Sequence, residues 1–315
     1  MTDEGIVLAG QRWDGVVQGA PAENATSSCR TGQVGSRGPA GVRAMSGSVR
    51  VCVGDAAEVV AGMPGGSVDC VVTSPPYWGL RDYRVAGQLG SESTVDLYVA
   101  RLVEVFGRVS RVLRPGGTAW LNLGDCFGGS WGNYVARGSV ARTAAARAAS
   151  RYGVHRPPQS AFRRKDLVGV PWRVALALQE RGWLVRNAVV WEKPNARPES
   201  VRDRLAQRHE TVFLLTRSPE HWFAPESDLG EAWPDVWRVP TGRSGTGHPA
   251  AGTVEIARRC VRLGCPRGGV VLDPFCGSGT TGIAALERGC SFVGVDLDPA
   301  CAGLARRRLA EVAAS

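Results

Sequence analysis

The alternation of short apolar runs with amphipathic segments is the feature that most restricts the fold of this chain. From residue 49 onward, apolar runs typical of buried strands alternate with longer segments whose apolar residues recur at helical spacing. The predicted strands are Val49–Val53, Val68–Val72, Thr118–Leu123, Leu184–Trp191, Thr211–Leu215, Val270–Leu272 and Phe292–Val295. The predicted helices are Thr94–Leu113, Pro171–Arg181, Thr253–Leu263, Thr280–Arg288 and Pro299–Ala310. This order predicts an α/β protein with a mostly parallel sheet covered by helices on both faces.

The same pattern divides the chain into an extension and one domain. Residues 1–44 are rich in Gly, Ser, Ala and Arg without a sustained period, which predicts a flexible N-terminal extension and makes Met45 a second candidate start. Residues 45–315 form the α/β domain, interrupted twice. An insertion at about 126–165 is basic and contains no acid. A segment at about 218–247 contains Trp222, Phe223, Trp233 and Trp237, which could stack on bases or form a small core.

Charge and composition limit the partners, the cellular location and the metals that are expected for the protein. The formal net charge of +9 suits a polyanionic partner, although charge alone is weak evidence for one. The chain has no apolar run of membrane-spanning length and no signal-peptide pattern, so we expect a cytoplasmic protein without a membrane partner. The nine cysteines lack the paired spacing of zinc ligands, so no metal is expected.

A glycine-rich turn near the C-terminus predicts a cofactor site. Asp273–Thr281 follows a predicted strand and precedes a helix, and Asp296 ends the next strand. Glycines there allow a ligand to approach the backbone, and an acid at this spacing can accept hydrogen bonds from ribose hydroxyls. Asp273 would repel the pyrophosphate of a nicotinamide cofactor, whereas it would suit a cationic amino group. S-adenosylmethionine has that amino group and a ribose but no phosphate, so it is the favoured cofactor.

A second loop, Thr73-Ser74-Pro75-Pro76-Tyr77-Trp78, directly follows the predicted strand Val68–Val72. Two successive prolines fix φ and leave carbonyls without neighbouring amide donors, which predicts a rigid loop rich in acceptors. This loop resembles the catalytic motif Asp/Asn/Ser-Pro-Pro-aromatic of the DNA amino-methyltransferases, whose Ser-Pro-Pro-Tyr version is commonest in cytosine-N4 enzymes. The catalytic motif precedes the cofactor motif, which is similar to the permuted β group of that family.

The resemblance implies a circularly permuted, Rossmann-like methyltransferase fold with a seven-stranded sheet that starts at its third strand. The implied catalytic residues are Ser74, Pro75, Pro76 and Tyr77. The implied cofactor-binding residues are Asp55, Thr73, Asp273, Phe275, Gly277, Ser278, Gly279, Thr280 and Asp296. The candidate DNA contacts, from the loop and the two interrupting segments, are Trp78, Arg163, Arg164, Lys165, Arg238 and Arg243.

The predicted function is methylation of cytosine N4 in double-stranded DNA, with S-adenosylmethionine as the cofactor and a restriction endonuclease as a possible partner in a restriction-modification system. Methylation of adenine N6 by the same fold is the nearest alternative. A methyltransferase acting on RNA or protein, a nicotinamide oxidoreductase and a non-catalytic DNA-binding module are more distant ones. The intact segment from Ser74 to Tyr77 argues against the last of these.

Overall fold

The computed structural model describes most of the predicted domain and three short strands before it. Apart from those strands, the described residues are 47–128, 162–196, 198–199, 201–224, 233–242 and 253–314. The strands are β1 (Ile6–Leu8), β2 (Gln11–Trp13) and β3 (Arg30–Gly32), of which β1 and β2 pair with each other and β3 pairs with the domain. The rest of the predicted extension, most of the basic insertion and parts of the aromatic segment lie outside the described residues.

Within the described ranges, one sheet of nine strands runs through the domain in the order β3-β4-β11-β10-β5-β6-β8-β7-β9. The domain strands are β4 (Val49–Val53), β5 (Val68–Thr73), β6 (Leu113–Leu123), β7 (Leu184–Glu192), β8 (His209–Thr216), β9 (Val236–Arg238), β10 (Val270–Asp273) and β11 (Ser291–Asp296). Neighbours from β4 to β6 are parallel, whereas β8 is antiparallel to both β6 and β7. All seven predicted strands are present, and β3 and β9 are short additions at the two edges.

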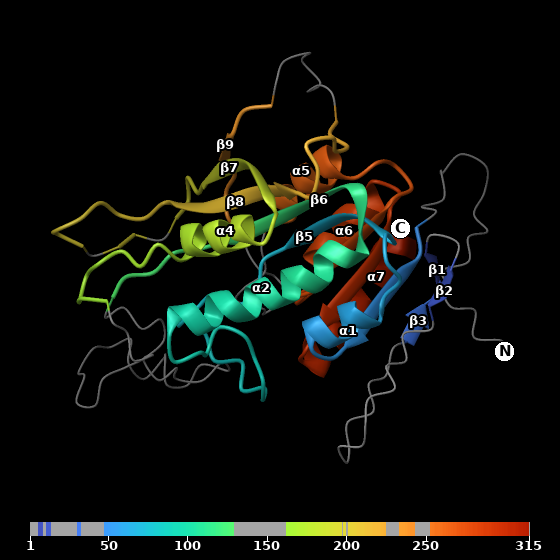
Figure 1. Cartoon of the computed structure of the whole chain (residues 1–315), viewed down its shortest axis with the longest axis horizontal. Coiled ribbons are helices and arrows are strands. Elements are labelled where there is room, and N and C mark those ends of the chain that lie inside the picture. Colours follow the sequence, from blue (N-terminus) through green and yellow to red (C-terminus); the bar gives the residue numbers. More distant parts are fainter. Residues whose placement is uncertain are drawn as a thin grey trace.

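Helices cover both faces of this sheet, as the alternation predicted (Figure 1). In the described part of the chain, one apolar core lies under α1 (Ala56–Gly62), α2 (Val95–Val112) and α4 (Val170–Glu180). The other lies under α5 (Val254–Gly264), α6 (Thr280–Glu287) and α7 (Pro299–Ala314). Successive residues of a strand face opposite cores, as Trp120 and Leu121 of β6 do. Both faces of the central strands are therefore buried, which explains why β5 and β10 are mostly apolar.

Two local features differ from the prediction. Sequence periodicity did not predict α1, which has seven residues and begins where the Asp55 side chain accepts hydrogen bonds from the amides of Ala57 and Glu58. The predicted strand Thr118–Leu123 begins earlier than expected, because Pro115-Gly116-Gly117 lies within β6, which begins directly after α2. The pairing of β5 with β6 shifts register there, between Val68 and Cys70, and this irregularity accommodates the segment.

The strand order confirms the permuted topology. The last two strands in the chain, β10 and β11, insert between the first two strands of the domain, β4 and β5. Leu272 of β10 pairs with Val71 of β5, so the loops after these two strands leave the sheet side by side. Segments about 200 residues apart in sequence are thus brought to one edge, where the parallel strands end. None of the helices in the described ranges is long and apolar enough to cross a lipid bilayer.

Candidate active site

A cavity of about 450 Å³ opens at the C-terminal edge of the parallel strands. It is lined by the loops that follow β4, β5, β10 and β11, and so it joins the two motifs that the sequence singled out. Lining residues include Asp55 after β4, Thr73 and Ser74 after β5, Asp273 at the end of β10, and Asp296 at the end of β11. Its volume lies within the range of roughly 300–1,000 Å³ that is usual for small-molecule sites.

Asp273 is the most buried carboxyl group of this cavity, with 4% of its surface exposed. The hydroxyl groups of Thr73 and Thr281 donate to its two oxygens, both at 2.7 Å, and the amide of Phe275 donates at 3.0 Å. Burial raises the pKa of Asp273 to about 6, although these three hydrogen bonds act in the opposite direction. The Thr73 bond links the Ser-Pro-Pro-Tyr loop directly to the glycine-rich loop.

Asp296 also lines the cavity, and backbone amides hold its carboxylate. The amides of Gly277 and Asp298 donate to its two oxygens at 2.8 and 2.9 Å. Burial raises the pKa of Asp296 to about 6, against the effect of these amides. A carboxylate oxygen can accept more than one hydrogen bond, so Asp296 retains capacity for a ligand. Gly277 and Gly279 have φ values of 51° and 81°, which explains why the turn around Asp296 requires glycine.

The remaining predicted cofactor residues differ in their roles. Phe275, Gly277, Ser278 and Thr280 line the cavity. Arg308 donates to the Ser278 hydroxyl at 2.9 Å, so that hydroxyl also ties the loop to α7. Thr281 was missed by the sequence reasoning, which stopped at its neighbour. A second threonine directly after the glycine turn was the available signal for it.

The catalytic loop is partly buried and is held by a hydrogen bond from α2. Ser74 is exposed at the rim of the cavity, Pro75 is buried, and Pro76 and Tyr77 are partly buried. The Tyr98 hydroxyl of α2 donates to the Pro76 carbonyl at 2.9 Å, which fixes that peptide. The loop backbone is therefore held at Pro76, while the Ser74 side chain remains accessible.

A polar network beneath the loop connects Ser74 with Tyr77. The Asn122 side-chain amide on β6 donates to the hydroxyls of Ser74 at 3.3 Å and Tyr77 at 3.0 Å. The Tyr77 hydroxyl donates to Glu210 of β8 at 2.8 Å, and Glu210 also forms an ion pair with Lys193. Burial, followed by the nearby Glu210, raises the pKa of Tyr77 well above its usual value, so its hydroxyl stays protonated. Neither Asn122 nor Glu210 was predicted as a site residue, because only the strand pairing brings them under the loop.

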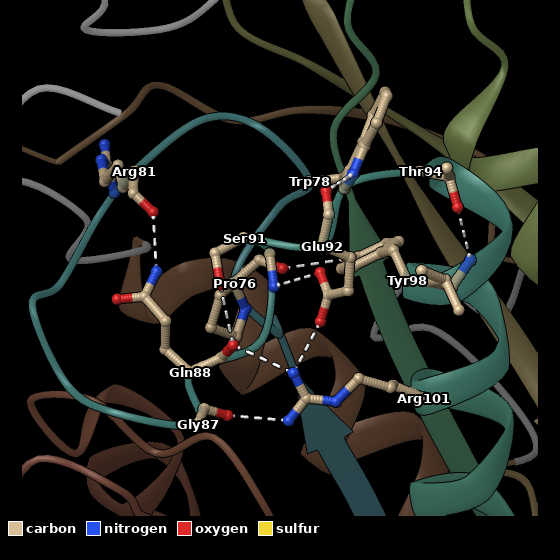
Figure 2. Close-up of polar contacts among 12 residues, drawn as sticks. Pro76, Trp78, Arg81, Gly87, Gln88, Ser91, Glu92, Thr94, Tyr98 and Arg101 are labelled. Atoms are coloured by element: carbon tan, nitrogen blue, oxygen red, sulfur yellow. Dashed lines mark hydrogen bonds and ion pairs between the residues drawn. The ribbon is translucent and has the colours of Figure 1, made fainter. Parts of the chain in front are cut away.

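The segment 79–93 contributes several residues to the cavity lining and is joined to α2 by hydrogen bonds (Figure 2). The Arg101 guanidinium donates to the carbonyls of Gly87 at 2.7 Å and Gln88 at 3.0 Å, and it pairs with Glu92 at 2.8 Å. Gly87 and Gln88 line the cavity, so Arg101 holds part of the cavity wall. Sequence reasoning did not find this role, since one arginine in an amphipathic helix carries no signal for it.

The predicted DNA contact at Trp78 is wrong. Only 3% of Trp78 is exposed, its ring packs in the core under α1 and α2, and its indole nitrogen donates to the Glu92 carbonyl at 2.9 Å. The side chain lacks an exposed surface that a nucleic acid could contact. It supports the catalytic loop from within.

The predicted cationic contacts lie on the surface where the structure describes them. Arg163, Arg164 and Lys165 are exposed, and Lys165 forms an ion pair with Asp203. The side chain of Arg238 on β9 is 73% exposed. Arg243 lies outside the described residues. These positions remain predictions for DNA contact.

The aromatic segment is mainly structural where it is described. Trp237 is 1% exposed and lies 6.0 Å from Trp120 between ring centroids. Trp222 and Trp233 pack partly buried against the same core. Phe223 is the more exposed of the described aromatic side chains in this segment. The three tryptophans therefore belong to the main core under α5, α6 and α7, and they do not form a separate small core.

The strand order and the paired loops define an α/β methyltransferase, and comparison with known proteins specifies the class. Residues 68–307 match the family described as DNA methylase, which groups N6 and N4 enzymes. The chain belongs to this family of DNA-methylating enzymes. The predicted family and fold are thereby confirmed, whereas the methylated base is left open.

Two type II methyltransferases are similar in sequence to most of this chain. It is 42% identical over 273 residues to the type II methyltransferase M.SmaI of Serratia marcescens, covering 83% of this chain and 91% of that protein. It is 41% identical to the type II methyltransferase M.Cfr9I of Citrobacter freundii, with coverages of 76% and 80%.

Solved structures show the same fold. TTHA0409 of Thermus thermophilus, a putative DNA modification methylase complexed with S-adenosylmethionine, is 26% identical, with a TM-score of 0.57 and coverages of 83% and 93%. That ligand agrees with the predicted cofactor. The cytosine-N4-specific PvuII DNA methyltransferase has a TM-score of 0.62 at 16% identity, with coverages of 84% and 91%, and it supports the fold alone.

Proposed function

We propose that the chain transfers a methyl group from S-adenosylmethionine to the exocyclic N4 amino group of cytosine in double-stranded DNA. The observation that carries the choice of base is Ser74, which stands at the cavity rim where the related motifs have Asp, Asn or Ser. A serine hydroxyl can both accept and donate a hydrogen bond, whereas a carboxylate only accepts. The Ser-Pro-Pro-Tyr version of the motif is commonest in cytosine-N4 enzymes.

The residues of the cavity fit this cofactor. Asp273 offers a carboxylate to a cationic amino group, and Asp296 offers acceptors to ribose hydroxyls. Asn122, also a lining residue, has a buried side-chain oxygen without a hydrogen-bond partner among the described residues. Buried acceptors are normally satisfied, so a ligand that donates a hydrogen bond here is expected. When bound, S-adenosylmethionine would supply a methyl group on its sulfonium. As the N–C bond forms, the S–C bond breaks, the sulfur departs as a neutral thioether, and the amino nitrogen releases one proton to solvent.

The catalytic loop prepares the amino nitrogen. The lone pair of an exocyclic amino group is delocalised into the base, and acceptors that hold its hydrogens favour a tetrahedral nitrogen. In the proposed reaction, the Ser74 hydroxyl and the Pro75 carbonyl are those acceptors, and the Tyr77 ring stacks on the base. A base in a duplex must first leave the helix, and an aromatic surface compensates for the lost stacking. The rate then depends on positioning and on oriented dipoles.

Adenine N6 is the second candidate substrate, because the family that the chain matches includes both N6 and N4 enzymes. The same acceptors would hold the adenine amino group, and only the shape of the base pocket would differ. We also propose that the chain protects DNA against a restriction endonuclease that cuts the same sequence, which is the arrangement that the names of its type II relatives suggest.

The experiment is to incubate the protein with labelled S-adenosylmethionine and mixed-sequence DNA, digest the DNA to nucleosides and identify the labelled product by mass. N4-methylcytosine is the expected product. N6-methyladenine would select the second candidate, and no label on DNA despite cofactor binding would overturn the proposal. Ser74→Ala should lose transfer but keep cofactor binding. Ser110→Ala, a helical serine on α2 outside the cavity, is the matched control and should keep both.

A further inference from the structure

The loop between β7 and β8, residues 193–208, leaves the sheet at the catalytic edge. Leu121 of β6 pairs with Thr73, where the catalytic loop begins, and Leu123 pairs with Thr211 of β8. Because β8 is antiparallel to β6, the residues before Thr211 lie at the edge where β5 and β6 end. Figure 1 shows the β7–β8 hairpin extending from the sheet at that end. Glu210, two residues beyond the loop, contacts the Tyr77 hydroxyl.

The described part of this loop is held in one conformation by Arg204. Its guanidinium donates to Glu199 at 2.7 Å and to the Leu205 carbonyl at 2.8 Å, and it lies 4.0 Å above the Phe127 ring. Glu199 also accepts from the Gln207 amide at 3.3 Å. At the base of the loop, the Lys193 amide donates to the Arg208 carbonyl at 2.8 Å. The Leu205 carbonyl and the Gln207 amide are therefore anchored, and so is the side chain of the preceding Arg204.

This anchored loop presents an apolar side chain to water. Leu205 is 91% exposed, whereas the other exposed large apolar residues among those described lie between 37% and 56%. A single exposed leucine is ordinary on a protein surface. Leu205 differs because the residues around it are fixed by hydrogen bonds and it lies on the edge that bears the catalytic loop.

The loop that carries this leucine also carries exposed cations. Arg202 and Arg208 are exposed on the same loop. The Lys165–Asp203 ion pair and the contact between Phe127 and Arg204 join the loop to the segment that carries the exposed Arg163 and Arg164. An apolar tip among arginines at a catalytic edge matches a nucleic acid, because arginines contact phosphates while apolar wedges separate stacked bases.

We propose that Leu205 inserts into duplex DNA at the target site and occupies the space left by the base that turns into the cavity. The inference rests on the proposed function, because it requires a DNA base to enter the cavity. Leu205 is then a positioning residue for the extrahelical base, and the neighbouring arginines contact the flanking phosphates. The wedge compensates for lost stacking, so its contribution is largest where the target base is paired and stacked.

The test compares methyl transfer on two duplexes that carry the sequence methylated by the wild-type protein. One has the normal base pair at the target, and the other has a mismatched base opposite it, which lowers the cost of extrusion. Leu205→Ala should slow single-turnover transfer on the paired duplex by about tenfold or more, which corresponds to a barrier change of about 1.4 kcal/mol. On the mismatched duplex, the rate of Leu205→Ala should be close to the wild-type rate. Leu205→Met should stay near wild type. Leu176→Ala, at a 56% exposed position on α4, is the matched control and should be normal on both duplexes.

Equal losses of transfer rate on the two duplexes, or no loss on either, would overturn the proposal that Leu205 inserts at the target site. Fluorescence of 2-aminopurine placed next to the target base gives a second measurement, since unstacking on binding should diminish in Leu205→Ala but not in Leu176→Ala. If the proposed function is wrong, the wild-type protein itself transfers no methyl group to DNA. If only the role of Leu205 is wrong, the wild-type protein transfers methyl groups normally, so the two failures are distinguishable. Leu205 is almost fully exposed, so its replacement should leave thermal unfolding unchanged.

Discussion

The Tyr77 hydroxyl offers the sharpest test of the network beneath the catalytic loop. Tyr77→Phe removes the hydroxyl but keeps the ring that is proposed to stack on the base. It deletes the donor to Glu210 at 2.8 Å and the acceptor of the Asn122 amide at 3.0 Å. Any defect of this variant therefore reports on the positioning of the ring and of Ser74, and not on stacking area.

The size of the effect follows from the partners that remain. A hydrogen bond to a charged group contributes about 1.5–3 kcal/mol, and more is lost when a buried charge is left without partners. Glu210 keeps its ion pair with Lys193 and its hydrogen bond from Asn122 at 3.0 Å, so it is not left unpaired. We therefore expect the lower end, about 1.5 kcal/mol, which corresponds to roughly a tenfold loss if it falls on the transition state.

The assay is steady-state and single-turnover methyl transfer to DNA by wild type, Tyr77→Phe and Tyr77→Ala, with thermal unfolding as the stability control. Tyr77→Phe should lower kcat about tenfold and leave the KM for cofactor nearly unchanged. Tyr77→Ala should lose considerably more, because the ring is also removed. Wild-type activity of Tyr77→Phe would refute a positioning role for the hydroxyl, and equal defects of the two variants would refute the separation of stacking from positioning.

Two further outcomes follow from the site geometry. Cofactor affinity, measured by titration calorimetry, should rise between pH 5 and 7, because burial raises the pKa of Asp273 and Asp296 to about 6 and the charged carboxylates bind the ligand. Because these pKa values are raised, the ligand-free folded protein binds more protons than the unfolded chain between about pH 4 and 6. Its free energy of unfolding should therefore fall as pH rises through that window, by at most about 3 kcal/mol per carboxyl. If neither the cofactor affinity nor the free energy of unfolding changed with pH, the burial argument would be contradicted. Gly124→Ala should reduce methyl transfer by on the order of 10²-fold, because the new Cβ would lie 2.7 and 2.9 Å from two atoms of the Tyr77 ring, which must move. Circular dichroism should show a folded protein, and normal activity would show that the ring position is not critical.

Periodicity was sufficient for the long elements. The seven predicted strands and five predicted helices all form, with boundaries that differ by a few residues, because their apolar spacing is dictated by burial on two faces of a sheet. It was insufficient for α1, which rests on the Asp55 cap, and for β9, which has three residues and forms by pairing with β7. Such short elements depend on their neighbours more than on their own composition.

The sequence by itself determined the chemistry of the loops. The acids, glycines and prolines at the ends of β5, β10 and β11 and in the loops after them are local patterns, because glycine and proline are favoured in turns for local conformational reasons. The acids and glycines favoured S-adenosylmethionine as the cofactor, and the order of the motifs, through the resemblance to the DNA amino-methyltransferases, implied the permuted fold. The base preference rests on one residue of the same motif, Ser74.

Only the tertiary structure decided which side chains support those loops. Asn122 and Glu210 reach Ser74 and Tyr77 because β6 and β8 pair antiparallel at one register, and a shift of β8 by one residue would turn Glu210 to the opposite face. Trp78 belongs to the core although its motif suggested a DNA contact. Burial and register arise from the packing of segments distant in sequence, and no local pattern encodes them.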